Sequence, residues 1–214
     1  VQKANMDACR MFILAVLAGA FIALGAAFST TASTGASEQL PYGIARLVSG
    51  VTFSLGLVLV VVGGAELFTG NNLIVMAWAG GKITSWAVLR NWAVVYIGNF
   101  IGAMGTAVLV YAAGQHELGA GAVGVTALRI AEAKCSLEFG QAVALGMLCN
   151  TLVCLAVWLT YSARTTTDRI LATVPPITAF VAAGFEHSIA NMYFIPLGLL
   201  IKLDALDANT MHSS

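Results

Sequence analysis

Two short polar segments interrupt long apolar runs of this 214-residue sequence, 120 residues apart. Both contain a glycine, a glutamate two residues later and an asparagine five residues after that: Gly64, Glu66 and Asn71 in the first, and Gly184, Glu186 and Asn191 in the second. A buried carboxylate needs a partner or a wet cavity. Either the two glutamates belong to an ion path, or each accepts hydrogen bonds from exposed backbone N–H groups and stabilises the break. Because both repeats carry one, we favour the stabilising role.

His187 is a different kind of residue, because its counterpart in the first segment is Leu67 and the repeat therefore does not require it. A histidine at membrane depth can donate a hydrogen bond to an anion, or a proton to the anion of a weak acid. Thr69 offers a hydroxyl in the opposite segment, and half-helix N-termini at both breaks would add positive potential. These two residues are the predicted anion site.

Further candidates surround the two segments. Five apolar residues flank them: Phe53, Leu57, Leu67, Phe68 and Phe180. Such residues can form constrictions that exclude hydrated ions, although ordinary packing explains each equally well. Lys134 and Asn150 could draw an anion into the pore, with a solvated lysine and a helix-bonding asparagine as the alternatives.

Composition places these residues in a membrane protein. Charged residues are only 9% of the chain, hydrophobic residues are 59%, and the ten cations balance the ten anions. So few charges cannot cover a soluble globule, and a nucleic-acid-binding protein would need excess Lys and Arg. The four cysteines lack metal-ligand spacing, so we expect no metal site. We also expect no cofactor.

Five apolar runs are long enough to cross a bilayer, namely residues 11–28, 47–79, 92–113, 139–161 and 170–201. The second would be about 50 Å long as one helix, against a hydrocarbon core of about 30 Å, so we predict two half-helices. The fifth is broken at the second polar segment. Residues 125–134 suit a short interfacial helix, and Gly98-x3-Gly102 suits close helix packing.

Matched breaks in two halves are typical of an inverted-repeat channel or transporter. We therefore predict an all-α membrane protein with three plus three helices, the second and fifth broken, in a single domain over residues 1–214. The repeats cover about 9–113 and 125–214. The third crossing begins near Asn91, and the same offset gives residue 211, so we expect the sixth helix to be missing from this chain. Six cations on the side of the N-terminus against four opposite place that terminus in the cytoplasm.

The sequence resembles the formate–nitrite transporter family, most closely its formate channel branch. The resemblance rests on four strings: AELFTGN at 65–71, YIGN at 96–99, CNTLVCLA at 149–156 and GFEHSIANM at 184–192. It implies an aquaporin-like fold, a homopentamer with one pore per protomer, and small substrates such as formate, nitrite or hydrosulfide. The family's central histidine and loop threonine match His187 and Thr69, and its vestibule pair matches Lys134 and Asn150. The five apolar residues named above match its constrictions.

We therefore predict a channel or proton-linked transporter for formate or a similar anion in a bacterial inner membrane, and not an enzyme. A neutral-solute pore of the aquaporin class would need Asn-Pro-Ala boxes at the breaks, which are absent from the sequence. A serine protease using Ser188 is disfavoured because adjacent residues do not easily form a nucleophile–base pair. A purely structural subunit would not need an intramembrane histidine.

Overall fold

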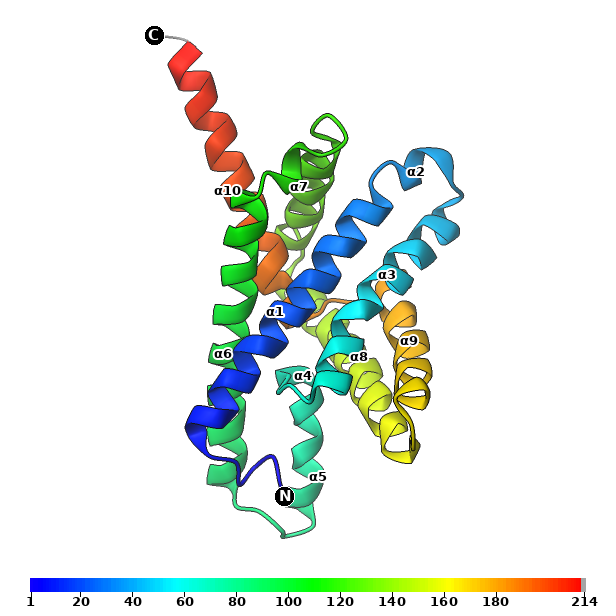
Figure 1. The fold of residues 1–214 in the computed structure, drawn as a ribbon, viewed down its shortest axis with the longest axis vertical. Helices are drawn as coiled ribbons and strands as arrows, with labels where there is room; N and C mark the ends of the chain where they lie inside the picture. The colour runs from blue at the N-terminus through cyan, green and yellow to red at the C-terminus, as the bar shows by residue number, and fades with distance from the viewer. Residues whose placement is uncertain (213–214) are drawn as a thin grey trace.

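The computed structural model describes residues 1–212, and the side chains of all of these except Ser37 and residues 207–212. The last two residues of the predicted domain, 213–214, lie outside the described part. Helices form all the regular structure of the described residues (Figure 1). In chain order the elements are α1 (Ala8–Ser33), α2 (Ala36–Gln39), α3 (Tyr42–Gly63), α4 (Phe68–Asn71), η1 (Asn72–Ile74), α5 (Val75–Ala79), α6 (Ser85–Ala112), η2 (Gln115–Glu117), α7 (Ala122–Cys135), α8 (Phe139–Leu159), η3 (Thr160–Ser162), α9 (Thr166–Ala182) and α10 (Ser188–His212).

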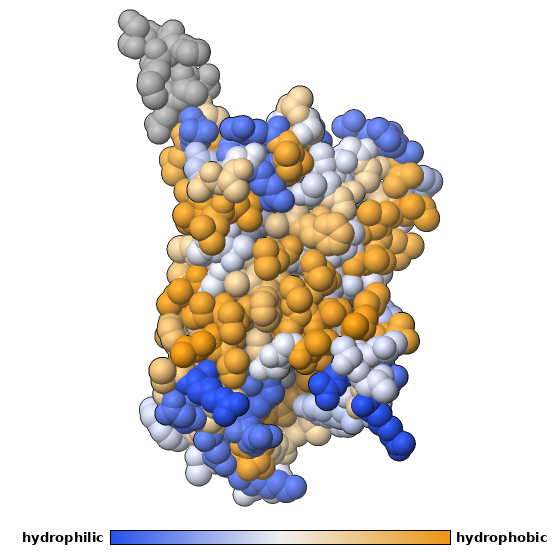
Figure 2. All heavy atoms as spheres, viewed as in Figure 1, coloured by the Kyte–Doolittle hydropathy of each residue, from blue (hydrophilic) through white to orange (hydrophobic). Residues whose placement is uncertain are grey.

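Five helical segments are long and apolar enough to cross a membrane: Ala8–Ser33, Tyr42–Gly63, Ser85–Ala112, Phe139–Ser162 and Ser188–Leu206. On the face shown in Figure 2, hydrophobic residues form a band across the middle of the molecule, and hydrophilic residues gather toward its two ends. That distribution fits a bilayer, in which apolar side chains face lipid and polar ones face water. The predicted all-helical membrane fold is confirmed.

The two broken segments run in opposite directions (Figure 1). Helix α3 runs from the end that carries α2 to the middle, and α4 and α5 continue toward the end that carries the N-terminus. Helix α9 starts near that second end and reaches the middle, where α10 continues toward the first end. Helices α3 and α9 pack against each other, and α1 packs against α3 and α6. The two breaks therefore meet in the interior.

Each leading half-helix ends in the same turn. Gly64 and Gly184 have φ angles of 71° and 78°, in the left-handed region that favours glycine. The residue after each glycine donates its backbone N–H to the carbonyl five positions earlier, Ala65 to Val60 and Phe185 to Phe180, both at 3.0 Å. This shared geometry is why the two breaks have the same residue spacing.

The predicted close packing through the glycine pair of α6 is confirmed. A Cβ atom added at Gly98 would lie 2.5 Å from the Cβ of Ala15, and one at Gly102 would lie 1.9 Å from the carbonyl oxygen of Val16. Both contacts are far below van der Waals separation, so α1 and α6 approach this closely only because the side chains are absent. The pair of helices forms a rigid wall beside the first break.

Two elements differ from their expected form. Helix α7, expected as an interfacial helix over residues 125–134, is longer and packs along α10, where the Cβ of Ala131 faces Gly198. Its buried residues are small, which allows this packing. Helix α10 continues to His212, well past the expected end near Ile201. The apolar run ends near Ile201, but the more polar residues that follow it continue the helix.

Candidate functional site

His187 and Thr69 meet where the two breaks face each other. His187 immediately precedes α10, and Thr69 lies in the first turn of α4. Their side chains are 3% and 4% exposed, and the Nε2 atom of His187 lies 3.3 Å from the Oγ1 atom of Thr69. The sequence predicted both residues as one site, and the fold brings them into contact across 118 residues of chain.

The other ring nitrogen of His187 fixes the tautomer. Nδ1 accepts the backbone N–H of Ala190 at 3.2 Å, which caps the start of α10. A nitrogen that accepts an N–H carries no proton, so the neutral ring has its proton on Nε2. The hydrogen atom available for binding therefore points toward Thr69. An imidazolium ring would need the Ala190 N–H to move away from Nδ1.

Apolar side chains enclose this contact. Four of the five predicted constriction residues are buried in one cluster with no more than 3% exposure: Phe53, Leu57, Leu67 and Phe180. The Phe180 ring stacks on the His187 ring with centroids 5.7 Å apart, and Phe53 meets Phe180 edge-on at 5.7 Å. Phe68 is different, because it is half-buried and packs against the rings of Trp92 and Tyr96.

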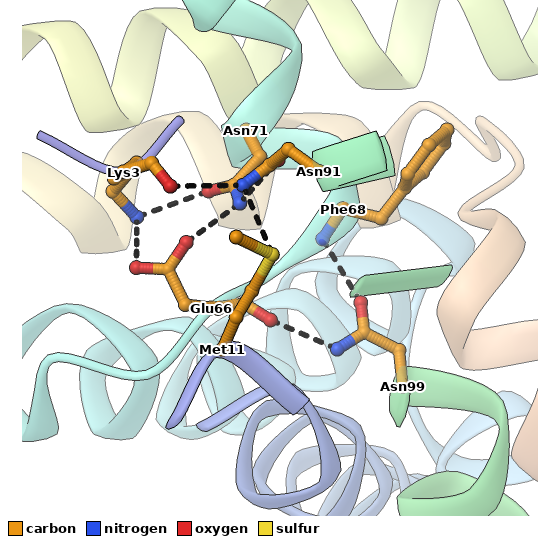
Figure 3. A network of polar contacts seen from close by, with 7 residues as sticks. All are labelled: Lys3, Met11, Glu66, Phe68, Asn71, Asn91 and Asn99. Atoms are coloured by element: carbon orange, nitrogen blue, oxygen red, sulfur yellow. Dashed lines mark hydrogen bonds and ion pairs between the residues drawn. The ribbon is translucent and has the colours of Figure 1, made fainter. Parts of the chain in front are cut away.

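The first-break cluster consists of Lys3, Glu66, Asn71 and Asn91 (Figure 3). Glu66 is 3% exposed, and its carboxylate accepts Asn71 Nδ2 at 2.7 Å and lies 3.0 Å from the Lys3 ammonium group. Lys3 also donates to Asn71 Oδ1 at 3.0 Å, and Asn71 donates to Asn91 Oδ1 at 3.0 Å. The buried charge therefore has both an ionic partner and hydrogen bonds.

Asn99 of α6 binds the backbone on both sides of the same break (Figure 3). Its amide donates to the carbonyl oxygens of Glu66 at 2.9 Å and Ala15 at 2.7 Å, and its Oδ1 accepts the N–H of Phe68 at 2.9 Å. These bonds satisfy backbone groups that the interrupted helix leaves free. Asn99 thus supports the start of the half-helix that carries Thr69.

The second-break cluster has the same plan, with Lys134, Glu186 and Asn191. The Lys134 ammonium group donates to both carboxylate oxygens of Glu186, at 2.8 and 3.0 Å, and also lies 5.3 Å from the centroid of the Phe194 ring. Asn191 donates to Glu186 at 2.8 Å. Side-chain exposures of 15% and 14% show that this ion pair is largely shielded from water. Lys134 is therefore not the solvated interfacial residue that the sequence left open.

The prediction that backbone N–H groups bind the two glutamate carboxylates is wrong. We expected backbone N–H donors, but lysine and asparagine side chains bind both carboxylates. The backbone N–H groups of the two glutamates instead donate to the neighbouring crossing, Glu66 to Leu14 at 3.1 Å and Glu186 to Leu145 at 3.4 Å. The side chains can provide opposite charge, which backbone amides cannot.

Lys3 is a site residue that was not predicted from the sequence, where it was treated only as a loop cation. The sequence nevertheless contains a pattern that pairs Lys3 with Lys134. Lys3 lies five residues before the start of α1, and Lys134 lies five residues before the start of α8. Leu14 and Leu145 follow these two lysines by eleven residues each. The first crossings of the two halves are therefore related by a different sequence offset from the one that relates the two breaks. The 120-residue offset of the breaks does not align Lys3 with Lys134.

Asn150 lies on α8 beside the first break, where its side chain serves as a link between neighbours. Its Oδ1 accepts Asn72 Nδ2 at 3.1 Å, and its own amide points to Cys154 Sγ at 3.8 Å. The Cys154 thiol in turn donates to the backbone carbonyl of Thr69 at 3.4 Å. Asn150 is thus connected to Thr69 through one thiol.

Two cavities approach the centre. One, of about 460 Å³, lies between α3, α7 and α9 and reaches His187, Phe53 and Phe180. The other, of about 400 Å³, is lined by α8 and α4 and reaches Thr69. Lys134 and Glu186 line both, so this ion pair lies between them.

Comparison with known proteins agrees with this geometry. The family model described as formate/nitrite transporter matches residues 1–213. Formate channel FocA of Escherichia coli is 46% identical over 202 residues, which cover 94% of this chain and 70% of that protein. Formate channel FocA of Haemophilus influenzae is 44% identical over 198 residues, covering 92% of this chain and 69% of that protein.

Solved structures share the fold. A pentameric formate channel with formate bound matches with a TM-score of 0.87 at 46% identity, over 92% of this chain and 76% of that one. An FNT family ion channel matches with a TM-score of 0.80 at 29% identity, over 92% of this chain and 78% of that one. The family match spans nearly the whole chain, and each of the two structural matches covers 92% of it. The chain belongs to the formate/nitrite transporter family of membrane proteins.

Proposed function

We propose that this protein is a channel that passes formate or a similar small monovalent anion of a weak acid. The observation that carries the proposal is the buried contact between His187 Nε2 and Thr69 Oγ1 at the meeting point of the two breaks. Two hydrogen-bond donors enclosed by apolar side chains suit a small anion that has lost its hydration shell. The relatives named formate channels support the choice of formate.

Binding uses His187 in its neutral form. The Nε2–H group and the Thr69 hydroxyl both donate to the anion, which lies beside this pair of atoms and bridges them. Ala190 holds Nδ1 as an acceptor, so the ring keeps the orientation that points Nε2–H at the anion. Hydrated ions that cannot shed water are rejected by the apolar side chains on both sides.

Proton transfer follows from the same geometry. When Nδ1 takes up a proton and the Ala190 N–H moves aside, the Nε2–H group of the imidazolium becomes a proton donor. It gives that proton to the bound carboxylate, and the ring returns to neutrality with its proton on Nδ1. The neutral acid then crosses the apolar side chains at a lower desolvation cost than the anion.

No covalent chemistry is part of this proposal. Ser188 directly follows His187, and both ring nitrogens are already engaged by Thr69 and Ala190. We further propose that the protein works as a homopentamer in a bacterial inner membrane with its N-terminus in the cytoplasm. The pentameric assembly of the matched formate channel supports the first part, which native mass spectrometry of the detergent-solubilised protein tests.

Stopped-flow uptake into proteoliposomes tests the choice of substrate, with formate, nitrite, hydrosulfide, water and glycerol compared side by side. We expect formate flux well above that of protein-free liposomes. Faster nitrite or hydrosulfide flux would keep the anion pore but reassign its substrate. Water or glycerol flux without anion flux would overturn the proposal.

A further inference from the structure

The cavity between α3, α7 and α9 runs from the exposed ring of Tyr42 to the buried His187. Five ionisable residues line it: Tyr42, Arg46, Lys134, Glu186 and His187. An anion that enters from this side meets their combined potential before it reaches the apolar side chains. Which of these residues supplies positive charge therefore decides how the cavity attracts anions.

Lys134 contributes little net charge. Its ammonium group bonds to both oxygens of Glu186 at 2.8 and 3.0 Å, so the two unit charges largely cancel beyond a few ångströms. A second donor to the same carboxylate, Asn191, fixes the pair in place. An anion in the cavity is therefore near a dipole at this point, and not near a free cation.

Arg46 is different, because its partners are neutral. Its Nε donates to the carbonyl of Ala182 at 3.2 Å, and its Nη2 donates to the carbonyl of Val181. Both carbonyls belong to the last turn of α9. In the described part of the chain, the only Lys or Arg ion pairs are those of Lys3 and Lys134, so no carboxylate compensates Arg46.

The guanidinium group also has unused donors. It carries five N–H bonds, and the two carbonyls of α9 take two of them. The carbonyls hold the group at the helix end, next to Gly184, whose added Cβ would lie 3.4 Å from Nη2. The remaining N–H bonds suit the two oxygens of a small carboxylate, which guanidinium groups bind in a fork.

We propose that Arg46 is the anion-capture residue of this cavity, where it binds a small carboxylate before the anion passes Phe53 and Phe180 to His187. This inference rests on the proposed anion channel and adds a binding site upstream of the central one. Arg46 supplies the uncompensated positive charge of the cavity, and Lys134 serves to neutralise Glu186.

The test is formate uptake by proteoliposomes as a function of formate concentration, at low and high ionic strength, with substrate added on the α2 side. Replacing Arg46 with Gln removes the charge but keeps an amide that can bind the α9 carbonyls. We expect Arg46→Gln to raise the half-saturating concentration roughly three- to tenfold at low salt, with maximal flux unchanged. The variant's half-saturating concentration should also depend much less on salt, because screening acts on the lost charge.

Two further variants separate charge from structure. Arg46→Lys keeps the charge and should keep the salt dependence. Arg129→Gln removes a cation from α7 that lines a different hollow, beside Glu38, and should change neither quantity. A loss of thermal stability and maximal flux in both Arg46 variants, with salt dependence unaltered, would show a merely structural role and overturn the inference.

Failure of the channel proposal gives a different result. Wild-type protein without any anion flux would refute the proposed function itself. Wild-type flux with an Arg46→Gln variant that matches it in half-saturation and salt dependence would refute only the role of Arg46.

Discussion

His187 and Thr69 are the residues that the inverted repeat does not explain. The repeat places Leu67 where His187 stands and Ile189 where Thr69 stands, so neither polar side chain is needed for the break itself. Glutamate and asparagine, by contrast, occur at both breaks and bind each other at both, at 2.7 and 2.8 Å. Residues shared by the repeats support the scaffold, and residues present in one repeat carry the proposed function.

Thr69→Val tests the hydroxyl with almost no change in shape. Valine removes one hydrogen-bond donor to the anion, worth about 1–1.5 kcal/mol, so formate flux should fall roughly tenfold. Thr151→Val is the matched control, because Thr151 is exposed and bonds only to its own helix at Met147. Uptake in proteoliposomes measures both. Equal flux in the two variants would remove Thr69 from the site.

Cys154 positions Thr69 through its backbone. A chain of donors runs from Asn72 to Asn150, then to Cys154, and ends at the Thr69 carbonyl. Cys154→Ala should lower maximal formate flux a few-fold, because the turn that carries Thr69 loses this restraint. Cys154→Ser keeps an O–H donor and should restore most of the flux. Equal flux in wild type and Cys154→Ala would show that the thiol does not act on Thr69.

Among the elements, α1 and α6 pack closely against each other, and Asn99 of α6 supports the first break. Gly102 faces α1, where an added Cβ would lie 1.9 Å from the Val16 carbonyl oxygen. A Cβ at Gly105 would meet nothing within 4 Å. Gly102 and Gly105 are about one turn apart on the same helix. Substituting alanine at either position therefore changes helix propensity equally, and only the packing against neighbouring residues differs.

Gly102→Ala should therefore destabilise the protein by about 1–3 kcal/mol or more, as overpacking does. Gly105→Ala should leave stability unchanged or raise it slightly, since alanine favours helix over glycine. Thermal unfolding in detergent compares the two variants. Similar melting temperatures would contradict the close packing of α1 against α6 at Gly102.

Several elements could be predicted from the sequence because their signals are local. Apolar runs defined the crossings, and the matched glycine, glutamate and asparagine defined both breaks. Lys3 and Arg46 could not be placed in the same way, since their partners lie in other elements: Glu66 for Lys3 and the end of α9 for Arg46. A fully solvated lysine and a lysine paired with a buried carboxylate look alike in sequence. Only the fold separates them.

At the level of the entire protein, the apolar band and the two polar ends define the direction normal to the membrane (Figure 2). The N-terminus and α5 lie at one end, and α2 lies at the other (Figure 1). Under the positive-inside rule, the excess of cations at the first end predicts that this end faces the cytoplasm. The capture cavity at Arg46 would then open toward the periplasm.

Cysteine labelling tests that orientation. Cys9 is exposed beside Arg10 at the N-terminal end, and Glu38 is exposed in α2 at the other end. In a background without other cysteines, a membrane-impermeant maleimide added to intact spheroplasts should label Glu38→Cys and spare Cys9. Permeabilised cells should label both. The opposite pattern would invert the topology.

The most direct test of the central claim is formate uptake by wild type and His187→Asn. Stopped flow measures the uptake from pH 8 to pH 5, with protein-free liposomes as the blank. Wild-type flux should rise as the pH falls, because protonation of the ring turns Nε2–H into a proton donor. His187→Asn cannot titrate, so its flux should be at least about tenfold lower and nearly independent of pH. A His187→Asn variant with wild-type flux and wild-type pH dependence would contradict the role assigned to the histidine.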